Sequence, residues 1–241
     1  MNIVAPSGKV FDTHERDLVR RGAQVGFLRY SREEPFLFKS GIESRFYVSG
    51  REDLTDNPDF EWSLGSLICD KVTEKYYSET RKHLPSLKRV CLIGIPTAGT
   101  APAQAAAMVE MGRRGNSWLC HRIMREKKKS HGANQTWVNG RPDFAKHFYV
   151  AVDNVVTDSK TKIEAAEKLA EDGYDPKNMP WIIIVDLQHG GLKRLEREGF
   201  KNIVVLYNLL DLVYVLQKDG VWPAGVVKQV EEEIAAHQLV S

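Results

Sequence analysis

An aspartate placed between an apolar run and a hydroxyl-rich turn is the first feature with chemical potential. The segment 149–162 runs through Asp153 and then through a turn that opens a helical pattern at about residue 159. The first backbone N–H groups of a helix are unpaired and favour an anion, so phosphate binding at this turn is physically natural. Asp153 could accept hydrogen bonds from ribose hydroxyls. The same pattern also fits an aspartate at a strand end followed by a serine N-cap, without any ligand.

A second loop rich in glycine and threonine, residues 94–101, follows another apolar run. Its two glycines have nearly the spacing of a P-loop, but the lysine that must follow the second glycine is missing, which excludes that class of nucleotide triphosphatase. The backbone amides of such a loop could still wrap a diphosphate. Taken in isolation, the loop is better explained as a simple tight turn. The candidate contacts here are Thr97, Ala98 and Gly99.

A basic run, residues 125–132, is the third candidate and contains Arg125, Lys129 and His131. Runs of this kind are usually solvated surface loops. This one belongs to the connection 124–143 between two predicted strands, which has little helical pattern, and long loops in compact domains are often lids or binding loops. Lysines and a histidine on a lid would suit a polyanionic substrate.

The elements that must position these loops alternate along the chain. Continuous β-branched runs predict strands covered on both faces, and the segments between them carry helical patterns. Short connections then predict an α/β fold with a doubly wound, mostly parallel sheet. The predicted strands are 90–94, 117–123, 148–152, 181–185 and 202–206, and the predicted helices of this part are 102–112, 159–171 and 191–198.

The beginning and the end of the chain differ from this alternating part. We expect a helix over 11–30, a hairpin-like pair of strands at 36–38 and 45–48, a helix over 60–83 and a last helix over 225–239. We therefore expect a single domain, 1–241. It comprises an N-terminal helix and hood, 1–60, and an α/β core, 61–241, with a flexible loop at 124–143.

The bulk composition narrows the functional classes. The hydrophobic fraction of 42% and charged fraction of 27% are ordinary for a globular protein, and a net charge of +2 does not indicate a nucleic-acid groove. The three cysteines lie far apart, which favours buried thiols in a reducing compartment over disulfides or zinc. The seven histidines show no metal-ligand spacing, and we expect His121 and His189 to be structural or to line a pocket. Neither a signal peptide nor a membrane span is visible, so we expect a cytoplasmic protein with no membrane or nucleic-acid partner.

Taken together, these segments resemble orotate phosphoribosyltransferase, a type I phosphoribosyltransferase, over most of the chain, roughly residues 36–212. Residues 38–41, with Ser44 and the Phe46–Tyr47 pair, look like the N-terminal substrate motif of that family. Residues 125–132 look like its catalytic flexible loop, and residues 152–162 look like its motif for phosphoribosyl diphosphate (PRPP). Three such segments in the family's order are more specific than any one alone.

The resemblance implies transfer of ribose 5-phosphate from PRPP to orotate. The products would be orotidine 5′-monophosphate and diphosphate, with Mg²⁺ held mainly by PRPP rather than by the protein. It implies a homodimer in which the flexible loop reaches the neighbouring subunit. Lys129 and His131 would then meet the diphosphate across the dimer, with Arg125 nearby. Fixed cations on a closing lid would stabilise that leaving group.

The remaining roles implied by the resemblance concern the substrates. Lys39 would approach PRPP and orotate, Phe46 and Tyr47 would flank the base, and Thr157 would contact the base side. Asp153 would hold the ribose hydroxyls, beside Asn154. The 5′-phosphate would be cradled by Asp158, Ser159, Lys160, Thr161 and Lys162.

Three positions depart from the family's pattern. Asn154 replaces the second acidic residue, Ser159 and Lys160 stand in a turn that usually contains glycine, and Leu187 replaces an arginine that recognises orotate. Losing a hydrogen bond to a charged group costs about 1.5–3 kcal/mol. Two alternatives therefore remain open: a phosphoribosyltransferase for another base, and a non-catalytic relative that binds PRPP or nucleotides.

Overall fold

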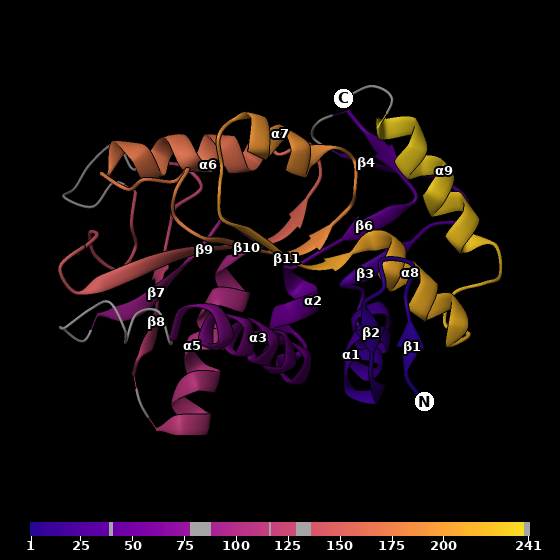
Figure 1. The fold of residues 1–241 in the computed structure, drawn as a ribbon, viewed down its shortest axis with the longest axis horizontal. Helices are drawn as coiled ribbons and strands as arrows, with labels where there is room; N and C mark the ends of the chain where they lie inside the picture. Colours follow the sequence, from indigo (N-terminus) through magenta and orange to yellow (C-terminus); the bar gives the residue numbers. More distant parts are fainter. Residues whose placement is uncertain (39–40, 78–87, 116, 129–135, 239–241) are drawn as a thin grey trace.

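The computed structural model describes residues 1–38, 41–77, 88–115, 117–128 and 136–238. Within them, five parallel strands form a sheet in the order β11-β10-β9-β7-β8 (Figure 1). This confirms the expected α/β class, and the sheet is parallel throughout. The strands are β7 (Arg89–Gly94), β8 (Leu119–Ile123), β9 (His147–Val156), β10 (Trp181–Asp186) and β11 (Ile203–Asn208).

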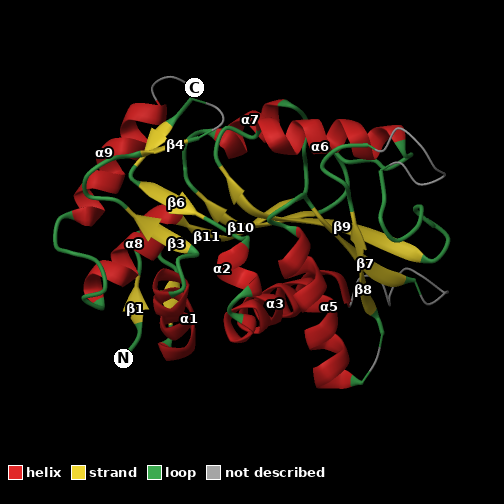
Figure 2. Ribbon diagram, turned by 180° about the vertical axis from the view of Figure 1, so that it is seen from behind, coloured by secondary structure: helices red, strands yellow, loops and turns green. Residues whose placement is uncertain are grey.

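Helices cover both faces of this sheet (Figures 1 and 2). The helices α6 (Lys160–Glu171) and α7 (Gly191–Arg197) lie on one face, and α3 (Pro58–Val72) and α5 (Thr100–Arg114) lie on the other. The central strands are therefore almost wholly buried, and apolar side chains from each face fill one of two core clusters. Burial on both faces explains why the strand sequences are continuously apolar rather than alternating.

The strand order places a topological switch point between β7 and β9. The chain runs outward in one direction from β7 to β8, and in the other direction from β9 through β10 to β11. Loops that leave the carboxyl ends of strands on either side of a switch point diverge, which opens a crevice where ligands of α/β proteins bind. The loop after β7 and the turn after β9 are the first two candidate segments of the sequence.

The predicted helix over 11–30 is shorter in the structure. Helix α1 (Thr13–Gln24) begins after Asp12, whose side chain accepts a hydrogen bond from the amide of Glu15. It ends before Gly26, which has a φ of +83°. The left-handed conformation stops the helix and turns the chain into a short strand, β3 (Leu28–Tyr30).

The predicted hairpin was only partly right. Strand β4 (Phe36–Leu37) pairs with β5 (Glu43–Ser44), whereas β6 (Phe46–Val48) pairs with β3. An apolar run does not specify with which strand it pairs, and the residues of β3 had been assigned to the predicted helix 11–30. Two further strands near the N-terminus, β1 (Ile3–Val4) and β2 (Val10–Phe11), pair with each other and were not predicted.

The other helices extend or correct the expected pattern. Helix α3 continues into a π-helical turn, η1 (Thr73–Tyr77), and the end of the predicted helix 60–83 lies outside the described residues. The short α2 (Glu52–Thr55) and α8 (Leu209–Lys218) were missed, and α9 (Val226–Gln238) fits the last predicted helix. No helix of the described chain has both the length and the apolar character needed to cross a membrane.

Candidate functional site

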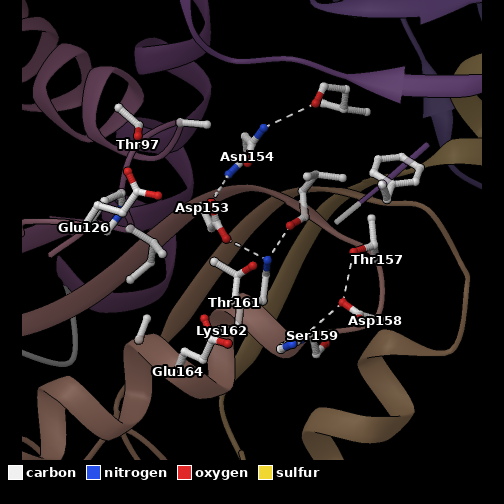
Figure 3. A pocket seen from close by; sticks show the side chains of 18 of the residues that line it. Thr97, Glu126, Asp153, Asn154, Thr157, Asp158, Ser159, Thr161, Lys162 and Glu164 are labelled. Atoms are coloured by element: carbon white, nitrogen blue, oxygen red, sulfur yellow. Dashed lines mark hydrogen bonds and ion pairs between the residues drawn. The ribbon is translucent and has the colours of Figure 1, made fainter. Parts of the chain in front are cut away.

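A cleft of about 540 Å³ lies at the switch point of the sheet (Figure 3). It is bordered by the loop after β7, by the turn from β9 into α6, by part of the N-terminal segment and by the start of the basic run. Eleven of the predicted site residues line it: Tyr47, Thr97, Ala98, Asp153, Asn154, Thr157, Asp158, Ser159, Lys160, Thr161 and Lys162.

Not every predicted residue lies at the cleft. Phe46, Gly99, Arg125 and Leu187 are described but are not among its lining residues. Lys39, Lys129 and His131 lie outside the described residues.

The two side chains at the end of β9 make different contacts. Asp153 Oδ2 lies 2.6 Å from the ammonium nitrogen of Lys162, on the first turn of α6. Both side chains are almost buried, with 7% and 4% exposure, and Lys162 also donates to the carbonyl of Val155 (Figure 3). The other carboxylate oxygen accepts the amide of Asn154 at 2.9 Å. The charge of Asp153 is thus compensated inside the protein before any ligand binds.

Lys162 is the functional candidate whose partner the sequence did not reveal. Its place after the turn suggested a contact with phosphate, and the structure instead directs its nitrogen to Asp153. The position of Lys162 in the sequence could have suggested this pair, because a lysine in the first turn of a helix lies near the end of the strand that precedes the turn. Its consequence is that Asp153 is held in a fixed orientation.

Asn154 has a physical reason to be an amide. Its Nδ2 donates to the carbonyl oxygens of Val48 and Ser49, in and just after β6. A carboxylate cannot donate and would face two carbonyl oxygens without a proton between them. Asn154 therefore ties the end of β9 to the N-terminal segment, and the departure from an acidic pair is coupled to this contact.

The turn into α6 adopts the conformation that glycine favours, although glycine is absent. Ser159 has φ +68° and ψ +2°, and its hydroxyl donates to the carbonyl oxygen of Gly191 at 2.7 Å. This buried hydrogen bond compensates for a backbone region that L-residues disfavour. The helix begins at Lys160, so its N-terminal amides border the cleft.

Asp158 occupies part of this helix start with its own carboxylate. Its Oδ1 accepts the amide of Lys160 at 3.2 Å and the hydroxyl of Thr157 at 3.4 Å. An incoming phosphate would compete with this carboxylate for the same donors. The positive side chain of Lys160, which also lines the cleft, offsets part of the added negative charge.

The loop after β7 packs tightly against β9. The amide of Ile95 donates to Val152 O at 2.8 Å, and the amide of Gly99 donates to Ile95 O at 2.9 Å. A Cβ atom on Gly99 would lie 2.2 Å from Val152 O, so only glycine fits. Gly99 thus shapes the loop, while Thr97 and Ala98 face the cleft.

The N-terminal segment contributes an aromatic wall. Tyr47 stacks with Phe38 at a centroid distance of 5.8 Å and an interplanar angle of 23°, and both line the cleft. Phe46, one residue earlier, points to the opposite side of β6. It is fully buried and packs against Tyr30 and Trp222 at 5.4 and 5.9 Å. Tyr47 is therefore the member of the pair that reaches the cleft.

The basic run starts at the rim of the cleft. Glu126 and Lys127 line it, and the amide of Arg125 donates to Thr136 O at 2.8 Å. Met124 forms an isolated antiparallel bridge with Trp137, so the described ends of the predicted lid are paired with each other. The Nε atom of Arg125 is buried and makes no hydrogen bond within the described part of the chain.

The described segment after β10 is absent from the lining of the cleft, and this includes the side chain of Leu187. That side chain is fully buried in the core, and its amide donates to Val156 O at 3.0 Å. Asp186 is buried too, and burial raises the pKa of its carboxyl group although the amide of Gln188 opposes the rise. Gln188 has φ +62° and accepts the amide of Leu210. Leu187 therefore brings neither a polar nor an apolar side chain to the cleft.

Comparison with known proteins supports the fold. No protein-family model and no curated protein matches the chain. Among solved structures, it superposes on UMP synthase from Leishmania donovani with a TM-score of 0.67 and 19% identity, over 92% of this chain and 42% of that one. The chain thus spans less than half of that protein.

Two further structures are matched over nearly their whole length. Orotate phosphoribosyltransferase from Aeropyrum pernix gives a TM-score of 0.56 and 20% identity, covering 86% of this chain and 99% of that one. The corresponding protein from Francisella tularensis gives 0.63 and 12%, covering 90% and 96%. At such identities the likeness establishes a type I phosphoribosyltransferase fold and leaves activity to be argued from the site.

Proposed function

We propose that the chain is a phosphoribosyltransferase that binds PRPP at the switch-point cleft and transfers ribose 5-phosphate to a nucleobase. One observation carries the proposal. The left-handed turn at Ser159 delivers the N-terminus of α6 to the same cleft as Asp153 and the loop after β7. A phosphate, a ribose and a diphosphate each find a suitable group there.

The roles follow from the order of these groups along the cleft. The 5′-phosphate binds at the amides of the first turn of α6 and near Lys160. The ribose hydroxyls meet Asp153, and the backbone around Thr97 and Ala98 faces the diphosphate. The base lies against Tyr47, since an aromatic face stacks on a planar ring.

Mg²⁺ fits this cleft as an ion carried by the substrate. Asp153 is already paired with Lys162, and the amide of Asn154 is bound to two carbonyls, so the strand end offers no free pair of carboxylates. The diphosphate oxygens of PRPP are then the main ligands of the ion. When bound, it would neutralise charge on the leaving diphosphate.

The chemical step separates charge. The bond between C1′ and the diphosphate oxygen breaks, the ribose gains oxocarbenium character, and a ring nitrogen of the base attacks C1′. Cations near the departing diphosphate stabilise the transition state. In our proposal Lys129 and His131, which lie outside the described residues, supply them with Arg125 and Lys127.

Orotate is the acceptor that we place first. The supporting features are the aromatic wall formed by Phe38 and Tyr47 and the basic run at the rim. We further propose that the protein acts in the cytoplasm as a homodimer that exchanges the loop 124–143.

A non-catalytic nucleotide-binding protein is the second candidate, and specific observations favour it. Asp153 is charge-compensated by Lys162, the carboxylate of Asp158 occupies the helix start, and Leu187 brings no cation to the cleft. A protein that only binds a nucleotide needs the phosphate turn but needs no group for the leaving diphosphate.

Loss of the orotate absorbance band in the presence of magnesium and PRPP tests the first assignment. We expect the band to decay at a rate proportional to protein concentration, and we expect one diphosphate to be released per orotate consumed. Absence of decay at high protein concentration rules out orotate. Diphosphate release with other bases then separates a transferase of different specificity from a binding protein, which releases none.

A further inference from the structure

Two imidazoles and one carboxylate gather outside the cleft, where the loop after β10 meets α9. One donor atom each of His189, Glu233 and His237 lies within 4.8 Å of the other two. The rings of His189 and His237 are 4.3 Å apart between centroids. None of the three lines the switch-point cleft, so the cluster is separate from the proposed phosphoribosyl site.

His189 is the buried member of the cluster. Its side chain has 0% exposure, and its Nε2 lies 3.0 Å from Glu233 Oε1. Its Nδ1 is also buried and has no hydrogen-bond partner among the described residues. A buried ring nitrogen without a partner loses its hydration without compensation, whether or not it carries a proton. The protein thus leaves one nitrogen of this ring available.

Glu233 is held in one orientation by two neighbours. Its Oε1 lies 3.0 Å from Nε2 of His189, and its Oε2 accepts the backbone amide of Arg45 at 3.1 Å. An oriented carboxylate is a suitable ligand for a divalent cation.

His237 lies one helical turn after Glu233 on the same face of α9. Its ring also forms a hydrogen bond with the backbone of Glu43. Metal-bound histidines are commonly oriented through their second nitrogen in this way.

We propose that His189, Glu233 and His237 bind one divalent transition-metal ion of the Zn²⁺ type. Two imidazoles and a carboxylate match zinc better than Mg²⁺ or Ca²⁺, which take oxygen ligands. Donor atoms around tetrahedral zinc are about 3.4 Å apart. His237 lies in the last turn of α9, where a small side-chain movement closes the difference from 4.8 Å.

The bound ion would act as a structural clamp. It joins the loop after β10 to α9, and the contacts of Glu233 and His237 with Ser44, Arg45 and Glu43 extend the clamp to β5. The ion would therefore fasten the last described helix to both the sheet and the N-terminal segment. This inference does not depend on the proposed transferase activity.

Cobalt binding to the full-length chain tests the site directly. The protein is stripped with a chelator, dialysed and titrated with Co²⁺, and the visible ligand-field bands report stoichiometry and geometry. We expect one equivalent with the intense bands of low coordination number, displaced by Zn²⁺. H237Q should weaken binding by at least about tenfold. H14Q, at an exposed histidine of α1, is the matched control and should bind as the unchanged protein does.

Thermal unfolding with and without Zn²⁺ gives a second readout. Zn²⁺ should raise the melting temperature of the unchanged protein and of H14Q but not of H237Q. If H237Q does not fold, E233Q takes its place, because its amide oxygen can still accept the Arg45 amide and its NH2 group can donate to Nε2 of His189. Absence of Co²⁺ binding by the unchanged protein, or equal binding by a folded cluster variant, would overturn the proposal.

Discussion

The ion pair of Asp153 and Lys162 orients the carboxylate at the end of β9 and compensates its charge. A single aspartate in a strand end suggested a group waiting for ribose, and the structure shows it bound to a lysine nine residues later. A buried pair of this kind contributes little net stability but makes each partner dependent on the other. The carboxylate keeps its orientation toward the cleft while its charge is compensated.

Removing Lys162 alone should therefore be costly. We expect K162M to lower the free energy of unfolding by about 3–5 kcal/mol, because Asp153 would be left charged and buried. The double variant D153N/K162M should recover most of this loss. Urea denaturation at neutral pH measures both. Equal destabilisation by the single and double variants would show that the pairing is not the cause.

Ser159 offers a second test at a single residue. S159A loses the hydroxyl bond to Gly191 but keeps a left-handed conformation, whereas S159G loses the bond and relaxes the conformation. S159A should therefore be less stable than S159G by about 1 kcal/mol. Denaturant unfolding of the two variants gives the difference directly. The opposite order would mean that the turn is not left-handed in solution.

At the scale of elements, the loop after β7 depends on close backbone approach. Gly99 has φ −79°, which any residue adopts, so its requirement is steric rather than conformational. Gly115 provides the converse case, since it has φ +62° and a Cβ there would meet no described atom within 4 Å. The two glycines bound the same helix, α5, at opposite ends.

These two sites make a matched pair of variants. G99A should cost about 1–3 kcal/mol of unfolding free energy through overpacking. It should also weaken PRPP binding, because the displaced loop borders the cleft. G115A should cost about 1 kcal/mol and leave binding unchanged. Calorimetric titration beside denaturant unfolding separates the effects, and unchanged binding by G99A would argue against a diphosphate contact at this loop.

The hydrophobic pattern of the sequence predicted the five strands of the central sheet, but it did not predict the short N-terminal strands or how they pair. The continuous apolar runs identified all five strands of the sheet, and the turn after β9 was located by its hydroxyls. Strands β1, β2 and β3 were missed because two or three residues carry too little periodicity. Phe46 and Tyr47 were grouped as base contacts, yet adjacent residues of a strand point to opposite faces, and only Tyr47 lines the cleft.

The spacing of residues along the sequence could not predict contacts between distant segments. Asn154 could be recognised in the sequence as a departure from the acidic pair of the family's pattern. Its bonds to the carbonyls of Val48 and Ser49, however, depend on how the N-terminal segment folds back. The cluster of His189, Glu233 and His237 was invisible for the same reason, since 44 residues separate the first two.

At the scale of the whole molecule, we expect the proposed site to be shared between two copies of the chain. If the loop of one subunit completes the cleft of the other, K129A and D153A should each be inactive as homodimers. A mixture allowed to exchange subunits should recover up to about a quarter of the unchanged activity, because half of the dimers are mixed and each has one intact site. A mixture as inactive as its components would indicate that each subunit uses its own loop.

The switch-point cleft as a PRPP site is the central claim, and calorimetric titration of the full-length chain with magnesium–PRPP tests it most directly. We predict saturable heat with one site per chain, competition by nucleoside monophosphates, and weaker binding to D153A than to K129A. Absence of heat with magnesium–PRPP, together with absence of heat when any nucleoside monophosphate is titrated alone, would contradict the assignment of the Ser159 turn as a phosphate site.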